Sequence, residues 1–278
     1  MIKFNCTFLI LSLFLVFFGC NQTTMVDQKS TEYKEILLKA FDEFISKKAT
    51  NSSAAMVRNE DHCIETGDSY CTTYTNTAYS QLYLPEYDCY VEVSFTVMLC
   101  INQFNRIDMF FKNMHIFYNN PTDCHVIKEH WLKLYEEKRY NELDASKTKF
   151  DEYVSKLVEA KFMKEFMNLF LLEFDCEKEV FLVYANFFKS QCFLYCVKPV
   201  IVDGGRKVLF FGETNEYCGT ACCKRLTNYC FNFQTKNIDQ TLIGYEKIGP
   251  PCSNQRLTFC DEGFTSFGED CDRDCNLP

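Results

Sequence analysis

The sequence predicts an α+β fold in which a mainly antiparallel sheet is packed with an antiparallel helical pair in a disulfide-rich domain. Three observations support this class. Segments with strand-like alternation come early and late in the chain, and segments with helical spacing lie between them, unlike the regular alternation of a parallel βαβ fold. The chain also holds 18 cysteines among 278 residues, a density typical of exported domains that depend on disulfides.

The chain begins with a short apolar segment that has the features of an export signal. Lys3 precedes an apolar run from Phe8 to Phe18 that a single serine interrupts, which fits a charged n-region followed by an h-region. A membrane-spanning helix needs about 20 apolar residues, and the run reaches that length only if Asn5 and Thr7 are counted as buried. We therefore expect residues 1–19 to be a signal peptide.

The end of this segment resembles the lipobox of bacterial lipoproteins. In that family a peptidase cuts before a diacylated cysteine that follows Gly, Ala or Ser, as Cys20 follows Gly19 here. Phe17 stands where the family usually has Leu, and Phe18 is bulkier than usual. The resemblance implies lipidation of Cys20, membrane attachment through its acyl chains, and a place in the cell envelope, at the outer membrane of a Gram-negative bacterium. Secretion is the alternative location.

The remaining cysteines are expected to be oxidised. Removal of Cys6 with the signal and lipidation of Cys20 leave an even number, so every thiol can pair in an oxidising compartment. The CxxC spacing of structural zinc sites does not occur in the sequence. The expected disulfide cysteines are Cys63, Cys71, Cys89, Cys100, Cys124, Cys176, Cys192, Cys196, Cys218, Cys222, Cys223, Cys230, Cys252, Cys260, Cys271 and Cys275.

Residues 20–61 are expected to form a lipid-anchored tether with one amphipathic helix. Apolar side chains recur at three- and four-residue spacing within residues 29–49, which is the pattern of a helix with one apolar face. That face can pack on the main domain or bind a partner. Small and polar residues replace the pattern over residues 50–61, as is typical of a linker.

A single cysteine-rich domain is expected over residues 62–278. Its first strong strand is CYVEVSFTVMLC, residues 89–100, in which alternate residues are apolar and one face is expected in the core. An extended chain rises about 3.3 Å per residue, so the two cysteines at its ends are too far apart to pair with each other. A partner strand is expected from Ile107 to Tyr118, followed by a turn over residues 118–123.

Two helices are expected after this turn. The first apolar face runs from Val126 to Tyr135, and a longer one runs from Phe150 to Phe170. NELDASK, residues 141–147, lacks apolar residues after its leucine and is expected to connect two antiparallel helices. Strand composition returns in VFLVYANFF, VLFFGET, LTNYCFNF and TLIGYEKI. The chain from Gly249 onward is expected to be a disulfide-pinned coil.

CGTACC, residues 218–223, is predicted to be a disulfide hub. Cys222 and Cys223 are adjacent, and a bond between neighbours needs a strained ring, so each should bond to a separate partner. The CxVxVxF strand, the helices after it and the CxxxCC group together resemble uncharacterised cysteine-rich exported proteins of Gram-negative bacteria. That resemblance implies no particular activity.

No sequence motif for a reaction is present. The four histidines are His62, His115, His125 and His130, and the last pair has neither the HExxH pattern nor the spacing to hold zinc on one helix face. A nucleophile elbow, a Walker loop and a Rossmann glycine pattern do not occur. Surface or packing roles are the preferred interpretation of the histidines.

One acidic segment near the end of the chain resembles the start of a calcium loop. Asp270, Asp272 and Asp274 alternate as in an EF-hand, but Cys275 occupies the position of the required glycine and the distal glutamate does not follow. A solvated acidic tail is therefore preferred over a calcium site. We expect no cofactor and no metal.

Charge and composition lead to the expected function. Without Lys3 the mature chain has 28 Lys and Arg against 38 Asp and Glu, so it should repel nucleic acid; a protein or carbohydrate ligand is the expected partner. We expect a lipid-anchored cell-envelope protein that is a non-enzymatic binding or structural module. One alternative is an exported hydrolase that uses Asp and Glu carboxylates. Another is a secreted eukaryotic disulfide-rich protein, since Asn21 and Asn51 begin glycosylation sequons.

Overall fold

The computed structural model describes residues 34–46, 70–71, 75–102, 106–117, 124–169, 174–177, 182–253, 259–267 and 275. The chain divides into two compact units, Met1–Phe44 and Ile45–Pro278. A helix forms over residues 34–46, within the segment 29–49 whose apolar spacing predicted one. The predicted signal peptide, Cys20, the linker, the turn at 118–123 and the aspartates at 270, 272 and 274 lie outside the described residues.

The larger sheet has the order β1-β3-β4-β5-β8-β9, and β2 pairs with the same edge of β3 as β1 does. Its strands are β1 (Tyr70–Cys71), β2 (Thr75–Leu84), β3 (Cys89–Ile101), β4 (Arg106–Phe117), β5 (Leu182–Ser190), β8 (Cys222–Asn232) and β9 (Asn237–Ile248). Only β4 and β5 pair in parallel among these described strands. The predicted α+β class, with its mainly antiparallel sheet, is confirmed.

The parallel pair requires a crossover connection, and the two predicted helices provide it. They are α2 (His125–Glu136) and α3 (Tyr140–Met167). The prediction that NELDASK connects the two helices, with Asp144 or Ser146 as the cap of the second, was wrong, because this segment forms the first turns of α3. Its Glu, Leu, Ala and Lys residues favour helix, and its leucine, Leu143, is fully buried. None of the helices in the described ranges has the length and apolar character of a bilayer-crossing segment.

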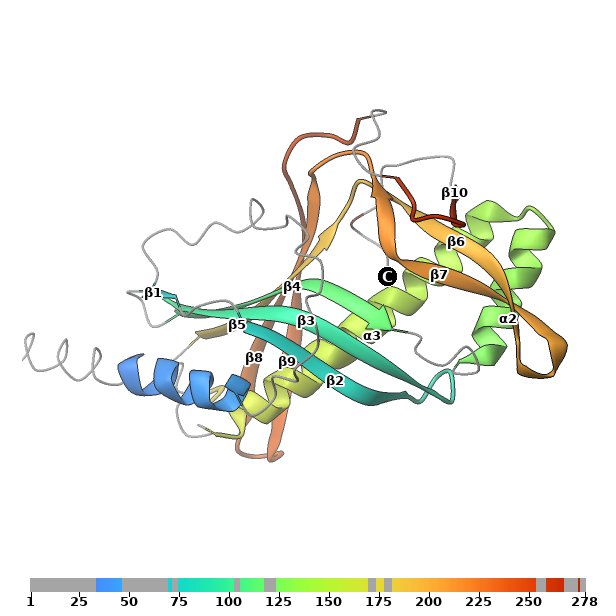
Figure 1. Ribbon diagram of the computed structural model, residues 1–278. Coiled ribbons are helices and arrows are strands. Elements are labelled where there is room, and N and C mark those ends of the chain that lie inside the picture. The colour runs from blue at the N-terminus through green and yellow to red at the C-terminus, as the bar shows by residue number, and fades with distance from the viewer. Residues whose placement is uncertain are drawn as a thin grey trace, which may run out of the picture. The chain divides into compact units, whose positions relative to one another are not determined.

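The two helices fold back on each other as an antiparallel pair. Trp131 of α2 donates a hydrogen bond from Nε1 to Ser146 Oγ at 3.0 Å. Its ring also meets that of Phe150 edge-on, with centroids 5.3 Å apart. Both partners lie early in α3, as the short connection requires. Figure 1 shows α3 lying diagonally across the larger sheet, with α2 at one end of the domain.

A smaller sheet, which the sequence did not predict, lies at the same end of the domain as α2 (Figure 1). It has the order β10-β6-β7, with β6 (Phe193–Val202), β7 (Arg206–Tyr217) and β10 (Thr265–Phe267). The chain enters this sheet from β5 and leaves it into β8. The C-terminal segment predicted as coil thus includes one short strand, β10, which pairs with β6. The Phe267 ring of β10 stacks on Tyr195 of β6 at a centroid distance of 5.8 Å.

Aromatic side chains fill the layer between α3 and the larger sheet. Phe162 of α3 contacts Phe95 and Phe111, with ring centroids 5.7 and 5.3 Å apart. The prediction that β3 buries one face was wrong for the half after Ser94, which is buried on both faces. Its second face carries a separate apolar cluster of Met98, Cys100, Phe110, Phe188 and Cys222.

Six disulfides join described residues: Cys71–Cys100, Cys89–Cys124, Cys176–Cys230, Cys192–Cys252, Cys196–Cys260 and Cys223–Cys275. Cys218 and Cys222 are also disulfide-bonded. The two ends of the β3 strand thus bond to different partners, as predicted, and so do the adjacent Cys222 and Cys223. Cys63 and Cys271 lie outside the described residues.

The predicted hub lies where the chain passes between the two sheets. The Cys218 amide donates to the Cys192 carbonyl at 3.1 Å, and the Gln191 amide donates to the Ala221 carbonyl at 2.8 Å. Gly219 allows this close approach, because a Cβ there would lie 2.7 Å from the sulfur of Cys192. Glycine is therefore required at the junction for reasons of space.

Candidate functional site

A buried ion cluster joins β8 to α3, and we call it the Arg225 cluster (Arg225, Glu152, Ser155, Glu159 and Tyr229). The Arg225 Nη1 donates to Glu152 Oε1 at 2.7 Å and to Ser155 Oγ at 2.9 Å. Its Nη2 donates to Glu159 Oε2 at 2.7 Å. The Tyr229 hydroxyl donates to the second oxygen of Glu159 at 2.9 Å. One cation from the sheet therefore holds carboxylates that lie about two turns apart on the helix.

Charges within the Arg225 cluster shift the pKa values of its members. Burial raises the pKa of Glu152, but the charge and hydrogen bond of Arg225 outweigh burial, so this pKa lies below its ordinary value. Burial lowers the pKa of Arg225, and the Glu159 and Glu152 carboxylates more than reverse this. Burial and the charge of Glu159 raise the pKa of Tyr229. At neutral pH, Arg225 and Glu152 are thus ionised and Tyr229 is protonated.

The Arg225 cluster fits a structural role better than acid–base catalysis. A general acid or base must reach a proton of its substrate, yet the Glu152 and Glu159 side chains are only 13% and 2% exposed. A catalytic group also needs a pKa near the working pH, whereas Arg225 lowers that of Glu152. We interpret this cluster as a clamp that fixes α3 on β8.

A second buried cation lies on α3 itself, in the Lys147 cluster (Lys147, Asp151, Trp131, Tyr195 and Phe211). The Lys147 Nζ lies 4.8 Å from the Tyr195 ring centroid, 4.9 Å from that of Phe211 and 5.8 Å from that of Trp131. Asp151 accepts from Lys147 at 2.5 Å and from the Tyr195 hydroxyl at 2.9 Å. The cluster joins α2, α3 and the smaller sheet, and its own lysine occupies the space between the rings.

The turn between β2 and β3 presents aromatic side chains to solvent. Tyr83 and Tyr90 are 43% and 54% exposed, and their ring centroids are 5.0 Å apart. Tyr87, in the turn itself, instead packs on α3, with its ring 4.8 Å from Phe150 and 5.5 Å from Tyr153. We call Tyr83 and Tyr90 the tyrosine patch. Exposed aromatic residues of this kind are enriched in binding surfaces.

Several contacts hold the tyrosine patch in place. The Tyr83 hydroxyl donates to Asp88 Oδ1 at 2.8 Å, and Asp88 adopts the left-handed conformation, with φ 46°, that Asp tolerates in turns. The disulfide Cys89–Cys124 joins the end of the turn to the start of α2. The patch is therefore rigid as well as exposed.

The charges that act on these tyrosines are acidic. The hydrogen bond to Asp88 and the charge of Asp88 raise the pKa of Tyr83. Burial, and then the charge of Glu86, raise the pKa of Tyr87, with a further contribution from Asp151. The phenols of Tyr83 and Tyr87 therefore stay protonated at neutral pH beside these carboxylates.

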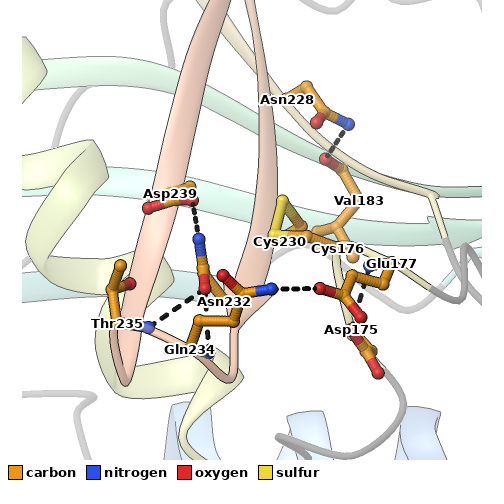
Figure 2. Close-up of a disulfide and its surroundings, with 10 residues drawn as sticks. All are labelled: Asp175, Cys176, Glu177, Val183, Asn228, Cys230, Asn232, Gln234, Thr235 and Asp239. Atoms are coloured by element: carbon orange, nitrogen blue, oxygen red, sulfur yellow. Dashed lines mark hydrogen bonds between the residues drawn. A yellow bond between two sulfur atoms is a disulfide. The ribbon is translucent and has the colours of Figure 1, made fainter.

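The hairpin end between β8 and β9 is equally well held (Figure 2), but only one ring of its aromatic pair is exposed, since Phe233 is 41% exposed and Phe231 is buried. The Asn232 side-chain carbonyl accepts from the amides of Gln234 and Thr235 at 3.0 and 3.1 Å. The Asn232 side-chain amide donates to Asp239 Oδ2 at 2.8 Å. The Gln234 side-chain amide donates to Glu177 Oε1, also at 2.8 Å. The disulfide Cys176–Cys230 lies beside this network, as Figure 2 shows. The polar groups at this end satisfy one another.

The histidines identified in the sequence do not come together. His125 and His130 both lie on α2, His115 lies on β4, and His62 is outside the described residues. Within the described ranges, no group of His, Cys, Asp and Glu side chains could hold a metal ion.

The residues that form the tyrosine patch were not identified from the sequence. The stretch YLPEYDCY, residues 83–90, does contain the available signal, since proline and aspartate mark a turn and tyrosines lie on either side of it. The Arg225 cluster left no such signal, because its partners are separated by 66 to 73 positions along the chain.

Comparison of the chain with protein-family models, with curated proteins and with solved structures finds no match in any of the three.

Proposed function

We propose that this protein is a lipid-anchored protein of the cell envelope that binds a partner through the tyrosine patch and does not catalyse a reaction. The observation that carries the binding role is the exposed pair of Tyr83 and Tyr90 on the two strands that flank a turn held by the Cys89–Cys124 disulfide. Tyrosine offers a large contact area at a small cost in conformational entropy, and a fixed turn lowers that cost further.

The buried carboxylates also favour a binding module over the hydrolase alternative. Glu152 and Glu159 are bound to Arg225, and Asp151 is bound to Lys147. These acids stabilise the packing of α3 in the domain. The surface turn, in contrast, places large side chains where a partner can reach them.

Site-specific photocrosslinking tests the binding role. A photoreactive phenylalanine analogue at Tyr90, in the membranes of cells that make the protein, should give one discrete crosslinked species. Phe259 is a matched control, since it is 74% exposed but lies outside the patch, and the same analogue there should not give that species. Tyr83→Ser should abolish the product at position 90. Identical products at both positions would contradict the proposal.

Metabolic labelling tests the anchor. The support for it is the lipobox resemblance at Gly19 and Cys20 and the even number of cysteines that remain. A labelled fatty acid should be incorporated into the protein, and Cys20→Ser should release it from membranes, since acyl chains supply about 0.8 kcal/mol per buried methylene. Unchanged labelling and membrane association in that variant would refute the anchor.

Thiol mapping tests the oxidised framework. We expect alkylation of the unreduced, unfolded protein to label none of the cysteines after residue 62. Peptide mapping should recover the six disulfides between described residues and find Cys218 and Cys222 oxidised as well. Two or more labelled thiols would reopen a metal-binding or nucleophilic role for them.

A further inference from the structure

We infer that the tyrosine patch binds a cationic segment of a partner protein, one that presents arginine or lysine side chains. This inference rests on the proposed binding function and names the chemistry of the partner. It combines the aromatic faces of Tyr83 and Tyr90 with the carboxylates around them, which together form a surface complementary to positive charge.

The turn between β2 and β3 carries negative charge. Between Leu82 and Glu92 the chain carries Glu86, Asp88 and Glu92 and has no lysine or arginine. Glu86 and Asp88 are both exposed. A cationic group that approaches the turn therefore meets carboxylates, whereas an anionic segment is repelled.

The two tyrosine rings are arranged so that one cation can contact both. A guanidinium or ammonium group within about 6 Å of an aromatic centroid is attracted to the ring face. The Tyr83 and Tyr90 centroids are 5.0 Å apart with planes inclined by 45°, so one cation can lie close to both rings. Asp88 accepts a hydrogen bond from the Tyr83 hydroxyl at 2.8 Å, which places a negative charge beside the same rings.

The molecule itself provides precedents for this chemistry. Lys147 lies over the Tyr195 ring with Asp151 as its counter-ion, and Arg106 lies 4.4 Å from the Tyr184 centroid with Asp108 as its partner. In each case a ring and a carboxylate share one cation. The tyrosine patch has the ring and the carboxylate on its surface, ready for a cation from outside.

Peptide binding to the intact, oxidised protein tests the inference. The probe is a fluorescent twelve-residue peptide that alternates glycine and arginine, and the comparison peptide replaces arginine with glutamate. We expect the arginine peptide to bind more tightly by at least about tenfold. Binding should weaken about tenfold in the Tyr83→Ser, Tyr90→Ser double variant and a few-fold in Glu86→Gln, Asp88→Asn. Tyr83→Phe with Tyr90→Phe should retain binding, because the rings remain.

Matched controls separate the patch from general attraction to an acidic protein. Asp239→Asn with Glu246→Gln removes the same number of exposed charges from β9, and Phe259→Ser removes an exposed ring elsewhere. Neither should change binding. Equal loss in the β9 variant, or undiminished binding after removal of both tyrosines, would overturn the inference.

The outcome also distinguishes the inference from the proposed function. If position 90 still crosslinks one species but the arginine peptide neither binds nor competes, the patch binds a partner of other chemistry, such as a carbohydrate or a neutral peptide. In that case the cationic partner is refuted and the binding function stands. If position 90 also gives no specific crosslink, both are refuted.

Discussion

Two buried cations contact α3, one at Lys147 near its start and one at Glu152 and Glu159 near its middle, and they find their counter-ions in different ways. Near its start the helix supplies Lys147, which inserts among aromatic rings of α2 and the smaller sheet and pairs with Asp151 of the same helix. Further along the helix supplies Glu152 and Glu159, and the larger sheet supplies Arg225. The lysine keeps its counter-ion one turn away, whereas the arginine depends on partners from a distant part of the chain.

The two clusters differ in how much each contributes to the placement of α3. Loss of the Lys147 cation leaves one carboxylate that is 14% exposed and still accepts a hydrogen bond from Tyr195. Loss of the Arg225 cation leaves two carboxylates, one of them 2% exposed. An unpaired charge costs more the deeper it lies. The Arg225 cluster should therefore contribute more to the placement of α3.

Arg225→Met should have the largest effect. It removes the cation that Glu152 and Glu159 share in a buried site and leaves Glu152 only its weaker pair with Lys156, and removal of one partner of a buried pair costs about 3–5 kcal/mol. Chemical denaturation at pH 7 measures the loss in the free energy of unfolding. A loss below that for Lys147→Met would reverse the comparison.

The pH dependence of the free energy of unfolding should test the contribution of the Arg225 cluster. Arg225 holds the folded-state pKa of Glu152 below its ordinary value, so the contribution of Glu152 is complete above its unfolded-state pKa of about 4.3. That contribution is lost as the pH falls below this value and approaches the lower folded pKa. Denaturation midpoints measured between about pH 6 and 3 should therefore decrease on acidification.

In Arg225→Met the folded-state pKa of Glu152 should rise. Burial then raises this pKa against only the charges of Lys189 and Lys156, so protonation of Glu152 costs the variant less stability than it costs the wild type. The stability deficit of the variant relative to the wild type should shrink as the pH falls from about 7 to 4. A constant deficit over this range would show that Glu152 is not coupled to Arg225.

Lys147→Met should have an intermediate effect. Methionine can fill the space among the three rings, and Asp151 keeps the Tyr195 hydroxyl. We expect a loss of about 1–2 kcal/mol in the free energy of unfolding, the range for a hydrogen bond to a charged group. The double variant with Asp151→Asn should be no less stable than Lys147→Met alone, because it leaves no unpaired charge.

Glu142→Gln should have the smallest effect and serves as the surface reference. Glu142 pairs with Arg139 at the start of α3, where both side chains are exposed, and solvent screens such pairs. We expect no measurable change in the thermal midpoint. A drop comparable to that of Lys147→Met would mean that the first turn of α3 depends on this pair.

Elements with a local sequence pattern could be predicted, whereas contacts between distant residues could not. Strands with alternating apolar residues, such as β3, and the apolar face of α2 were predictable because their pattern is local. The start of α3 was not, since Lys147 reads as a solvent-facing residue until Trp131, Tyr195 and Phe211 are known to surround it. Likewise, no local pattern indicates that Arg225 on β8 pairs with Glu152.

The tyrosine patch failed to emerge from the sequence for a related reason. The pairing of β2 with β3 brings Tyr83 opposite Tyr90, and β2 itself was not predicted. Without that strand the tyrosines appeared as unrelated members of an aromatic-rich chain. Register, rather than composition, places them together.

The disulfides also determine what happens when the chain is cut. Every peptide bond from Cys176 to Cys275 is spanned by Cys176–Cys230, Cys192–Cys252, Cys196–Cys260 or Cys223–Cys275. A protease that cleaves a single bond in this part of the molecule therefore releases no fragment. The nicked protein keeps the mass of its chain on a nonreducing gel and separates into two pieces only after reduction.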